Sequence, residues 1–212
     1  MKKIVITYCF SVLMLALSSS LYAQDAGELM KALCAKHRAF STIKATFSYT
    51  IEAKGKATQT QTGTIYIKGD KYKMEIAGQE LFCDGKTQWS YLKESNEVQI
   101  NVPTPNKDDM SPTTIFTMYD KGFLYKMASD KVDPDKQMVE LTPTDKNKSF
   151  FKIKLTITKA EKQIVESQMF DKSGGKNTYT IKNFVSNAPL ADDFFIFHKA
   201  KYPGVEEVDL RN

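Results

Sequence analysis

Histidine and cysteine, the residues that most often bind metals or act as nucleophiles, are scarce in this chain, which has two histidines and three cysteines among 212 residues. His37 and His198 lie far apart, and neither has metal-ligand spacing to the other or to a cysteine. No serine lies in a Gly-x-Ser-x-Gly elbow, and no cofactor fingerprint is present. These absences disfavour metalloenzymes, serine hydrolases and cofactor-dependent enzymes. We therefore expect no catalytic residue, no metal and no cofactor.

One pair of residues keeps an enzyme as an alternative. Cys34 and His37 stand three residues apart on a predicted helix, a spacing that allows a base to activate a thiol, although no third orienting group is evident. Cys83 is the other cysteine that follows the export signal described below. Export would permit a disulfide between Cys34 and Cys83. Free cysteines tend to be buried, so two separate buried thiols are the favoured interpretation.

A long hydrophobic run is also missing. Lys2 and Lys3 precede an apolar stretch over residues 4–17, and small residues follow up to Ala23. This order is typical of an export signal, and the stretch is shorter than the roughly 20 residues that a membrane span needs. We expect cleavage after Ala23, which leaves residues 24–212 as a single soluble domain in the periplasm. The net charge of +5 falls to +3 without the two lysines, and no basic block stands out, so nucleic acid is not an expected partner.

The rest of the chain has two kinds of apolar periodicity. A helical period from residue 25 to about residue 40 predicts one helix, with Asp25 as N-cap and Glu28 three residues later. From Ile43 to Ala53 the period changes to two, which predicts a half-buried strand. Further strands are predicted at residues 63–68, 71–76, 80–83, 89–92, 97–102, 123–127, 138–141, 150–158, 163–170, 177–184 and 193–197, with residues 203–211 as a tail.

A short helix over residues 113–119 interrupts these strands. Ser111 and Pro112 supply its start signals, and its large apolar residues share one side. The sequence therefore predicts a mainly β (α+β) fold: one curved antiparallel sheet of ten or eleven strands, with an N-terminal helix and a short helical lid on its concave face. One helix and one lid are too small to seal so large an apolar face, so we expect an internal cavity.

The residues expected to line this cavity are large and apolar, and many are aromatic or Met side chains that adapt to a ligand. For any one of them a place in a packed core is the favoured interpretation, and only the set as a whole favours a pocket. The set is Leu33, Phe47, Tyr49, Ile65, Ile67, Tyr72, Met74, Ile76, Trp89, Tyr91, Ile115, Phe116, Met118, Tyr119, Phe151, Ile153 and Leu155.

Several segments, in order, resemble a known family. They are the first strand with Ala45-Thr46-Phe47, the hairpin residues 63–68, the turn at residues 84–87 before Trp89 and Tyr91, the helix at Pro112, and the closing residues 195–197, 203–205 and 209–211. Together these segments resemble the LolA-like periplasmic carriers of outer-membrane lipoproteins. The resemblance implies an unclosed half-barrel fold. It also implies that the protein is a monomer that receives acylated lipoproteins from an inner-membrane transporter and delivers them to an outer-membrane acceptor.

One departure from the family pattern concerns the lid. Where the family carriers place a lid-locking arginine after the strand at residues 65–68, this chain has Gly69 and Asp70. Another group must hold the lid, or the ligand differs. Two alternative functions stay open: a carrier of another amphiphile such as a glycolipid, and a regulatory domain that senses lipids or lipoproteins. The stress sensors of this fold have an additional C-terminal domain, whereas this sequence ends at Asn212.

Overall fold

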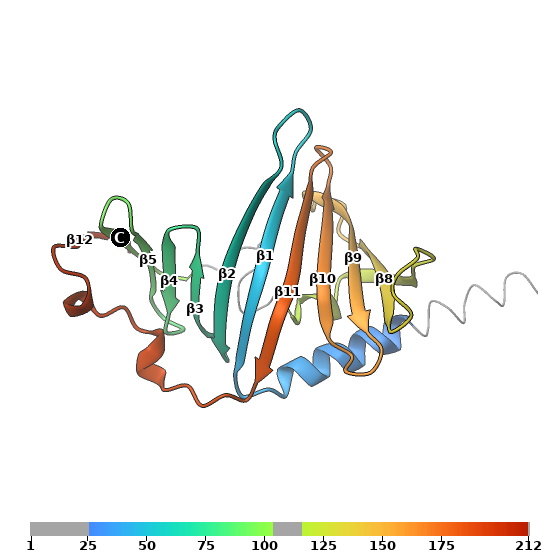
Figure 1. Cartoon of the computed structure of the whole chain (residues 1–212), viewed down its shortest axis with the longest axis horizontal. Helices are drawn as coiled ribbons and strands as arrows, with labels where there is room; N and C mark the ends of the chain where they lie inside the picture. Colours follow the sequence, from blue (N-terminus) through green and yellow to red (C-terminus); the bar gives the residue numbers. More distant parts are fainter. Residues whose placement is uncertain (1–25, 104–115, 212) are drawn as a thin grey trace, which may run out of the picture.

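The computed structural model describes residues 26–103 and 116–211. In them the chain forms one twelve-stranded sheet in the order β12-β6-β5-β4-β3-β2-β1-β11-β10-β9-β8-β7, and its two end strands are not joined (Figure 1). The strands are β1 (Ile43–Glu52), β2 (Gln59–Lys68), β3 (Lys71–Ile76), β4 (Gln79–Cys83), β5 (Gln88–Leu92), β6 (Glu97–Asn101), β7 (Phe123–Met127), β8 (Lys136–Pro143), β9 (Phe150–Thr158), β10 (Ile164–Asp171), β11 (Lys176–Ser186) and β12 (Glu206–Asp209). The pairing is antiparallel throughout except between β12 and β6, which are parallel. The expected mainly β, unclosed sheet is confirmed, with one or two more strands than expected.

Short turns between the strands explain why the chain forms a meander. Ala77 and Gly78 join β3 to β4 with φ values of 44° and 79°, and two positive φ angles are what a type I′ hairpin turn requires. Gly69, with a φ of 57°, is the first of the two residues between β2 and β3, the position that a type II′ turn reserves for glycine. Such turns suit the twist of antiparallel strands, so neighbouring strands in the sequence become neighbours in the sheet.

The sheet has two faces that alternate residue by residue, and cross-strand pairs share a face. We call inner the face that carries the row Ile43, Ile67, Tyr72, Cys83 and Gln88 across β1 to β5. We call outer the face that carries the adjacent row Lys44, Tyr66, Lys73, Phe82 and Trp89.

The N-terminal helix covers residues 26–38 of the described chain and packs on the inner face. Its buried residues recur at helical spacing, and they are Ala26, Met30, Leu33, Cys34 and His37. The expected cap at Asp25 lies outside the described residues, as do the export signal and residues 104–115. No helix in the described ranges combines the length and the apolar character that a membrane crossing needs.

The C-terminal segment (residues 188–211) crosses the outer face, so the strand predicted at residues 193–197 is wrong. Asp192–Phe195 forms the 3₁₀ helix η2, and Lys199–Lys201 forms a second one, η3. The apolar residues here are consecutive and do not alternate. The short helix therefore places Phe194 against Tyr66, with ring centroids 4.9 Å apart, and buries Phe195 completely. β12 then covers the edge of β6, where the sequence indicated only a tail.

Side chains from the outer face hold this segment in place. Phe82, Val98, Phe197 and Val205 form a buried cluster, and Trp89, Tyr91 and Tyr202 pack around it. Asp192 forms ion pairs with Lys68 and Lys71, both at 2.8 Å. These two lysines lower the pKa of Asp192 to about 2. The outer face of β3 to β6 is therefore occupied by the chain's own C-terminus.

Candidate functional site

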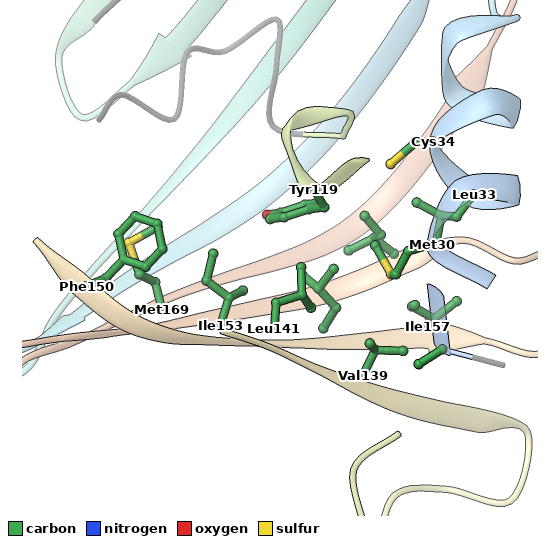
Figure 2. Close-up of a cluster of buried hydrophobic side chains, with 13 residues drawn as sticks. Met30, Leu33, Cys34, Tyr119, Val139, Leu141, Phe150, Ile153, Ile157 and Met169 are labelled. Carbon is green, nitrogen blue, oxygen red and sulfur yellow. The ribbon is translucent and has the colours of Figure 1, made fainter. Parts of the chain in front are cut away.

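The inner face is divided into two halves, of which the first is closed by the helix. Figure 2 shows Met30 and Leu33 of the helix on the side of Val139, Leu141 and Ile157 of the strands, and Cys34 directed toward Tyr119. The cluster also contains Ala26, Tyr119, Phe150, Leu155, Ile164 and Met169, none more than 9% exposed. We call this region the closed half. It is a packed core in the usual sense of contact between buried apolar side chains.

Tyr119 ties the segment after residue 116 to this core. It is the middle residue of the 3₁₀ helix η1 (Met118–Asp120), and its side chain is fully buried. Its hydroxyl oxygen lies 3.0 Å from the hydroxyl oxygen of Ser167, and its carbonyl oxygen accepts a 2.9 Å hydrogen bond from the Tyr125 hydroxyl. Burial raises the pKa of Tyr119 to about 12, so the phenol stays protonated at neutral pH.

The second half of the inner face, over β1 to β4 and β11, is only partly covered, and we call it the open half. Its buried floor consists of Ile43, Ala45, Phe47, Ile65, Ile67, Tyr72, Cys83 and Phe116. Around the floor lie apolar side chains that keep part of their surface exposed: Phe40, Tyr49, Met74, Ile76, Leu81, Tyr179, Ile181 and Phe184. Apolar surface left exposed in one contiguous set marks a binding region more often than scattered single residues do.

A pocket of about 260 Å³ lies at the end of the open half, between the helix and the β2–β3 turn. Its walls are His37, Arg38, Phe40, Ser41, Thr42, Ile43, Ile67, Gly69, Asp70, Phe116 and Thr117. Ligand pockets usually measure about 300–1,000 Å³, so this one is small for a whole lipid. A hydrocarbon chain would have to extend from it along the open half.

His37 forms the wall between pocket and core. Its Nδ1 lies 2.9 Å from the carbonyl oxygen of Leu33, so Nδ1 carries the proton and donates it. The ring stacks on Phe116 with centroids 5.3 Å apart and has edge contacts with Phe40 and Phe184. Burial lowers the pKa of His37, so the imidazole is neutral at pH 7. His37 therefore packs against neighbouring aromatic rings and has, among the described residues, no contact that indicates a catalytic role.

The geometry removes the support for an enzyme based on Cys34. The thiol is fully buried, and burial raises the pKa of Cys34 to about 11. A reactive cysteine needs an accessible thiolate, which this environment disfavours. Cys34 and Cys83 are both free and buried, as the favoured interpretation of the sequence predicted. Within residues 26–103 and 116–211, no three His, Cys, Asp or Glu side chains are placed to share a metal ion.

Two predicted lining residues belong to the other face. Trp89 pairs with Phe82, and Tyr91 pairs with Glu80, so both lie on the outer face, where Phe197 and Tyr202 cover them. The cause is the turn that precedes them. This turn pairs Cys83 with Gln88, so the Gln88 side chain lies on the inner face and the next side chain, that of Trp89, lies on the outer face. Trp89 and Tyr91 are therefore not part of the inner surface.

Phe151 is the third correction. The pairing of β9 with β10 jumps from Lys152–Phe170 to Phe150–Asp171, which leaves Phe151 as the extra residue of a β-bulge. Phe150 and Ile153 consequently face the closed half, whereas Phe151 points outward and is 47% exposed.

The remaining predicted lining residues divide between the two halves. Leu33, Tyr119, Ile153 and Leu155 belong to the closed half, with Met118 packed against it, and Ile115 lies outside the described residues. Phe47, Tyr49, Ile65, Ile67, Tyr72, Met74, Ile76 and Phe116 come together in the open half. Sequence reasoning missed Leu81, Tyr179, Ile181 and Phe184 of this half, although their strands were predicted and the alternation within them could have identified the first three.

Comparison with known proteins gives the chain a family. The sequence profile described as outer membrane lipoprotein carrier protein LolA matches residues 19–171, which is most of the chain. The chain belongs to this LolA-like family. No curated protein matches it. A solved protein of Thermus thermophilus, described as an uncharacterized conserved protein, has the same fold, with a TM-score of 0.56 and 12% identity over 87% of this chain and 99% of that one.

Two other solved structures are similar at lower scores. A LolA superfamily protein from Nitrosomonas europaea has a TM-score of 0.43 and 11% identity, over 83% of this chain and 98% of that one. The MucA/MucB complex of Pseudomonas aeruginosa contains a chain with a TM-score of 0.43 and 14% identity, over 82% of this chain and 62% of that one.

After β2, where the resemblance described above implies a lid-locking arginine, this chain has Gly69 and Asp70. Gly69 and Asp70 lie in the pocket wall, and so does Arg38 from the end of the helix. The Arg38 guanidinium forms a 2.8 Å ion pair with Asp120, four residues after Phe116. The helix thus holds the segment that begins at Phe116 by a charge pair from its own side chain.

Proposed function

We propose that this LolA-like protein is a periplasmic carrier that binds the acyl chains of lipoproteins on the open half and moves them from the inner to the outer membrane. The observation that carries the proposal is the unequal cover of one apolar face. In the closed half, thirteen buried residues of the described chain have five partly exposed apolar neighbours, whereas in the open half eight buried residues have eight. The family match to lipoprotein carriers supports this interpretation.

The energetics of a half-covered face suit a carrier. Each fully buried methylene contributes ~0.8 kcal/mol, so a completely enclosed sixteen-carbon chain would gain on the order of 12 kcal/mol. A chain that contacts the protein on one side only gains roughly half of this, ~6 kcal/mol. That value corresponds to an affinity between about 1 µM and 1 mM, from which a cargo can be released to an acceptor.

Phe116 and the pair Arg38–Asp120 are the parts that could regulate access. Phe116 is 2% exposed and its ring contacts both His37 and Phe184, at the junction of the pocket with the open half. A movement of this side chain would join the pocket to the rest of the open half. We propose that release of the Arg38–Asp120 pair accompanies this movement, in place of the arginine lock of the family.

The test is acyl-chain binding by two matched variants, measured with a fatty acid whose fluorescence rises in apolar surroundings. Leu81→Asp places a carboxylate among the partly exposed residues of the open half. Val185→Asp places the same group on the outer face of β11, where the side chain is 50% exposed. We expect the first variant to lose binding at least tenfold and the second to bind as the wild type does. Equal binding by Leu81→Asp and wild type, with both folded by circular dichroism, would remove the open half from the account.

A glycolipid carrier is the second candidate, and the pocket is the observation that favours it. Ser41, Thr42 and Asp70 give one wall of the pocket hydroxyl and carboxylate groups, which could contact a sugar. Mass spectrometry of material that co-purifies with the protein separates the two. Acylated N-terminal peptides would support carriage of lipoproteins by this protein, from an inner-membrane transporter to an outer-membrane acceptor. Glycolipid would support the second candidate.

A further inference from the structure

Three hairpins project from one end of the sheet. The antiparallel register pairs Glu52 at the end of β1 with Lys176 at the start of β11, and Asp171 at the end of β10 with Phe150 at the start of β9. The β1–β2, β10–β11 and β8–β9 hairpins therefore lie at the same end of the strands, and Figure 1 shows the first two of them side by side. We call this end of the sheet, with the side chains named below, the tip surface.

The tip surface has an excess of positive charge. Residues 52–59, 143–150 and 170–177 together contain six lysines and three acidic residues. Glu52 is paired with Lys176 at 2.9 Å. The carboxylate of Asp171 is occupied by its own turn, since it accepts hydrogen bonds from the backbone N–H groups of Ser173 and Gly175.

The lysines of the first hairpin are the most available ones. Lys54 and Lys56 are exposed, and neither forms an ion pair with another residue in the described part of the chain. Lys146 of the β8–β9 hairpin is also exposed, and the Lys172 side chain extends toward its carbonyl oxygen. The hairpins thus present cations to solvent on several sides of this end of the sheet.

Large apolar side chains adjoin these cations on the outer face. Phe151 is 47% exposed and Leu124 is 66% exposed. The Phe151 and Phe170 rings lie 6.4 Å apart, and the Lys152 Nζ lies 6.0 Å from the centre of each. β7 is the end strand of the sheet, and Leu124 lies near its start, beside the β8–β9 hairpin. The C-terminal segment covers the other end of the outer face and not this one.

We propose that the tip surface docks the protein onto an anionic phospholipid bilayer. Exposed lysines are attracted to the phosphates of such a bilayer, and Phe and Leu side chains between them can enter the boundary of headgroups and acyl chains. The charge excess selects an anionic surface, and the aromatic pair with a lysine above it suits a boundary that is both charged and apolar. Docking at this end would bring Tyr49 and Tyr179, the part of the open half nearest the tip surface, toward the membrane, with the pocket at the opposite end of the strands. The docking itself does not depend on the identity of the cargo.

The test is sedimentation of the purified protein with vesicles. Phosphatidylcholine vesicles that contain phosphatidylglycerol are compared with vesicles of phosphatidylcholine alone, at low and at high salt. We expect binding only to the anionic vesicles and a marked loss at high salt. The double substitution Lys54→Glu, Lys56→Glu is expected to weaken binding by at least about 25-fold, which is about fivefold for each lysine removed.

The matched control reverses the same two charges elsewhere. Lys31 on the helix and Lys162 in the β9–β10 turn are exposed and lie away from the tip surface. Lys31→Glu, Lys162→Glu is expected to bind like the wild type. Phe151→Ser is expected to weaken binding to anionic vesicles severalfold. All variants are expected to keep wild-type fatty-acid binding, which separates this proposal from that of the carrier.

Four results would overturn the proposal. They are no binding of the wild type to anionic vesicles, an equal loss in the control variant, wild-type vesicle binding by Phe151→Ser, and a loss of fatty-acid binding in the tip variants. In the first case an acidic protein partner becomes the alternative occupant of the tip surface.

Discussion

Gly63 lies in the middle of β2 on the inner face, directly beneath the ring of Phe47, with which it pairs across the strands. A Cβ atom at this position would lie 2.6 Å from the carbonyl oxygen of Glu75 and 2.7 Å from Cζ of Phe47. The first of these atoms belongs to the backbone of β3 and cannot rotate away. Gly63→Ala therefore forces the two strands apart and lifts the Phe47 ring.

The size of the effect follows from two opposing contributions. Overpacking of this kind costs about 1–3 kcal/mol. The loss of glycine from a strand returns about 0.5–1 kcal/mol. The net destabilisation is thus at most about 2.5 kcal/mol, with a central value of about 1.3 kcal/mol. At about 2–4 °C per kcal/mol, the melting temperature should fall by about 3–5 °C for the central value and by no more than about 10 °C. Because the Phe47 ring moves into the open half, fatty-acid binding should weaken as well.

The control is the same substitution at Gly27 of the helix. The nearest atom to its Cβ would be Cδ2 of Tyr125 at 3.7 Å, an ordinary contact. Gly27→Ala should leave the melting temperature unchanged or raise it, since alanine favours a helix by up to ~1 kcal/mol over glycine. Calorimetry of the two variants provides the comparison. A Gly63→Ala protein that melts at or above the wild-type temperature would refute the close packing of Gly63 beneath Phe47.

Three further predictions concern the charge pairs and the tryptophan. Arg38→Met should change stability by less than ~1 kcal/mol, because the pair is partly exposed, but should accelerate hydrogen exchange in residues 116–120; unchanged exchange would argue against the tether to Asp120. The pKa of Asp192 is lowered from 3.8 to about 2 by its two lysine partners, so its stabilising effect is complete above pH 3.8 and is lost as the pH falls through about 2. The emission of Trp89 should shift to longer wavelength over that range as the C-terminal segment loosens, and Asp192→Asn should abolish the shift. Fatty-acid binding should leave the Trp89 emission unchanged, since its ring faces the outer cluster, and a large change would place the ligand on the wrong face.

Strand positions could be predicted from the sequence because a half-buried strand alternates, and the run from Ile43 onward is an example that β1 confirms. The face of a strand is a different matter, since it depends on the exact length of a turn. In the β4–β5 turn, Asp84 accepts hydrogen bonds from the N–H groups of Lys86 and Thr87 at 2.8 and 2.7 Å, and this geometry sets the register. A shift of one residue would have moved Trp89 to the inner face.

Two other errors have related causes. Phe151 points outward because a bulge adds one residue to β9, and alternation alone cannot locate such an insertion. The C-terminal segment has no periodicity, and its course depends on the apolar cluster that the outer face offers to Phe197 and Val205. The open half was predicted in part because most of its residues lie on the regular strands β1 to β3.

The central claim is that a hydrocarbon chain lies on the open half of the inner face. Photo-crosslinking with a fatty acid that carries a diazirine at its end, followed by mass spectrometry of the labelled peptides, tests it directly. We predict labels on inner-face residues of β2 to β4 such as Ile65, Met74 and Leu81, which an excess of unlabelled fatty acid removes. Labels confined to the outer cluster around Trp89, or spread equally over both faces, would contradict the account.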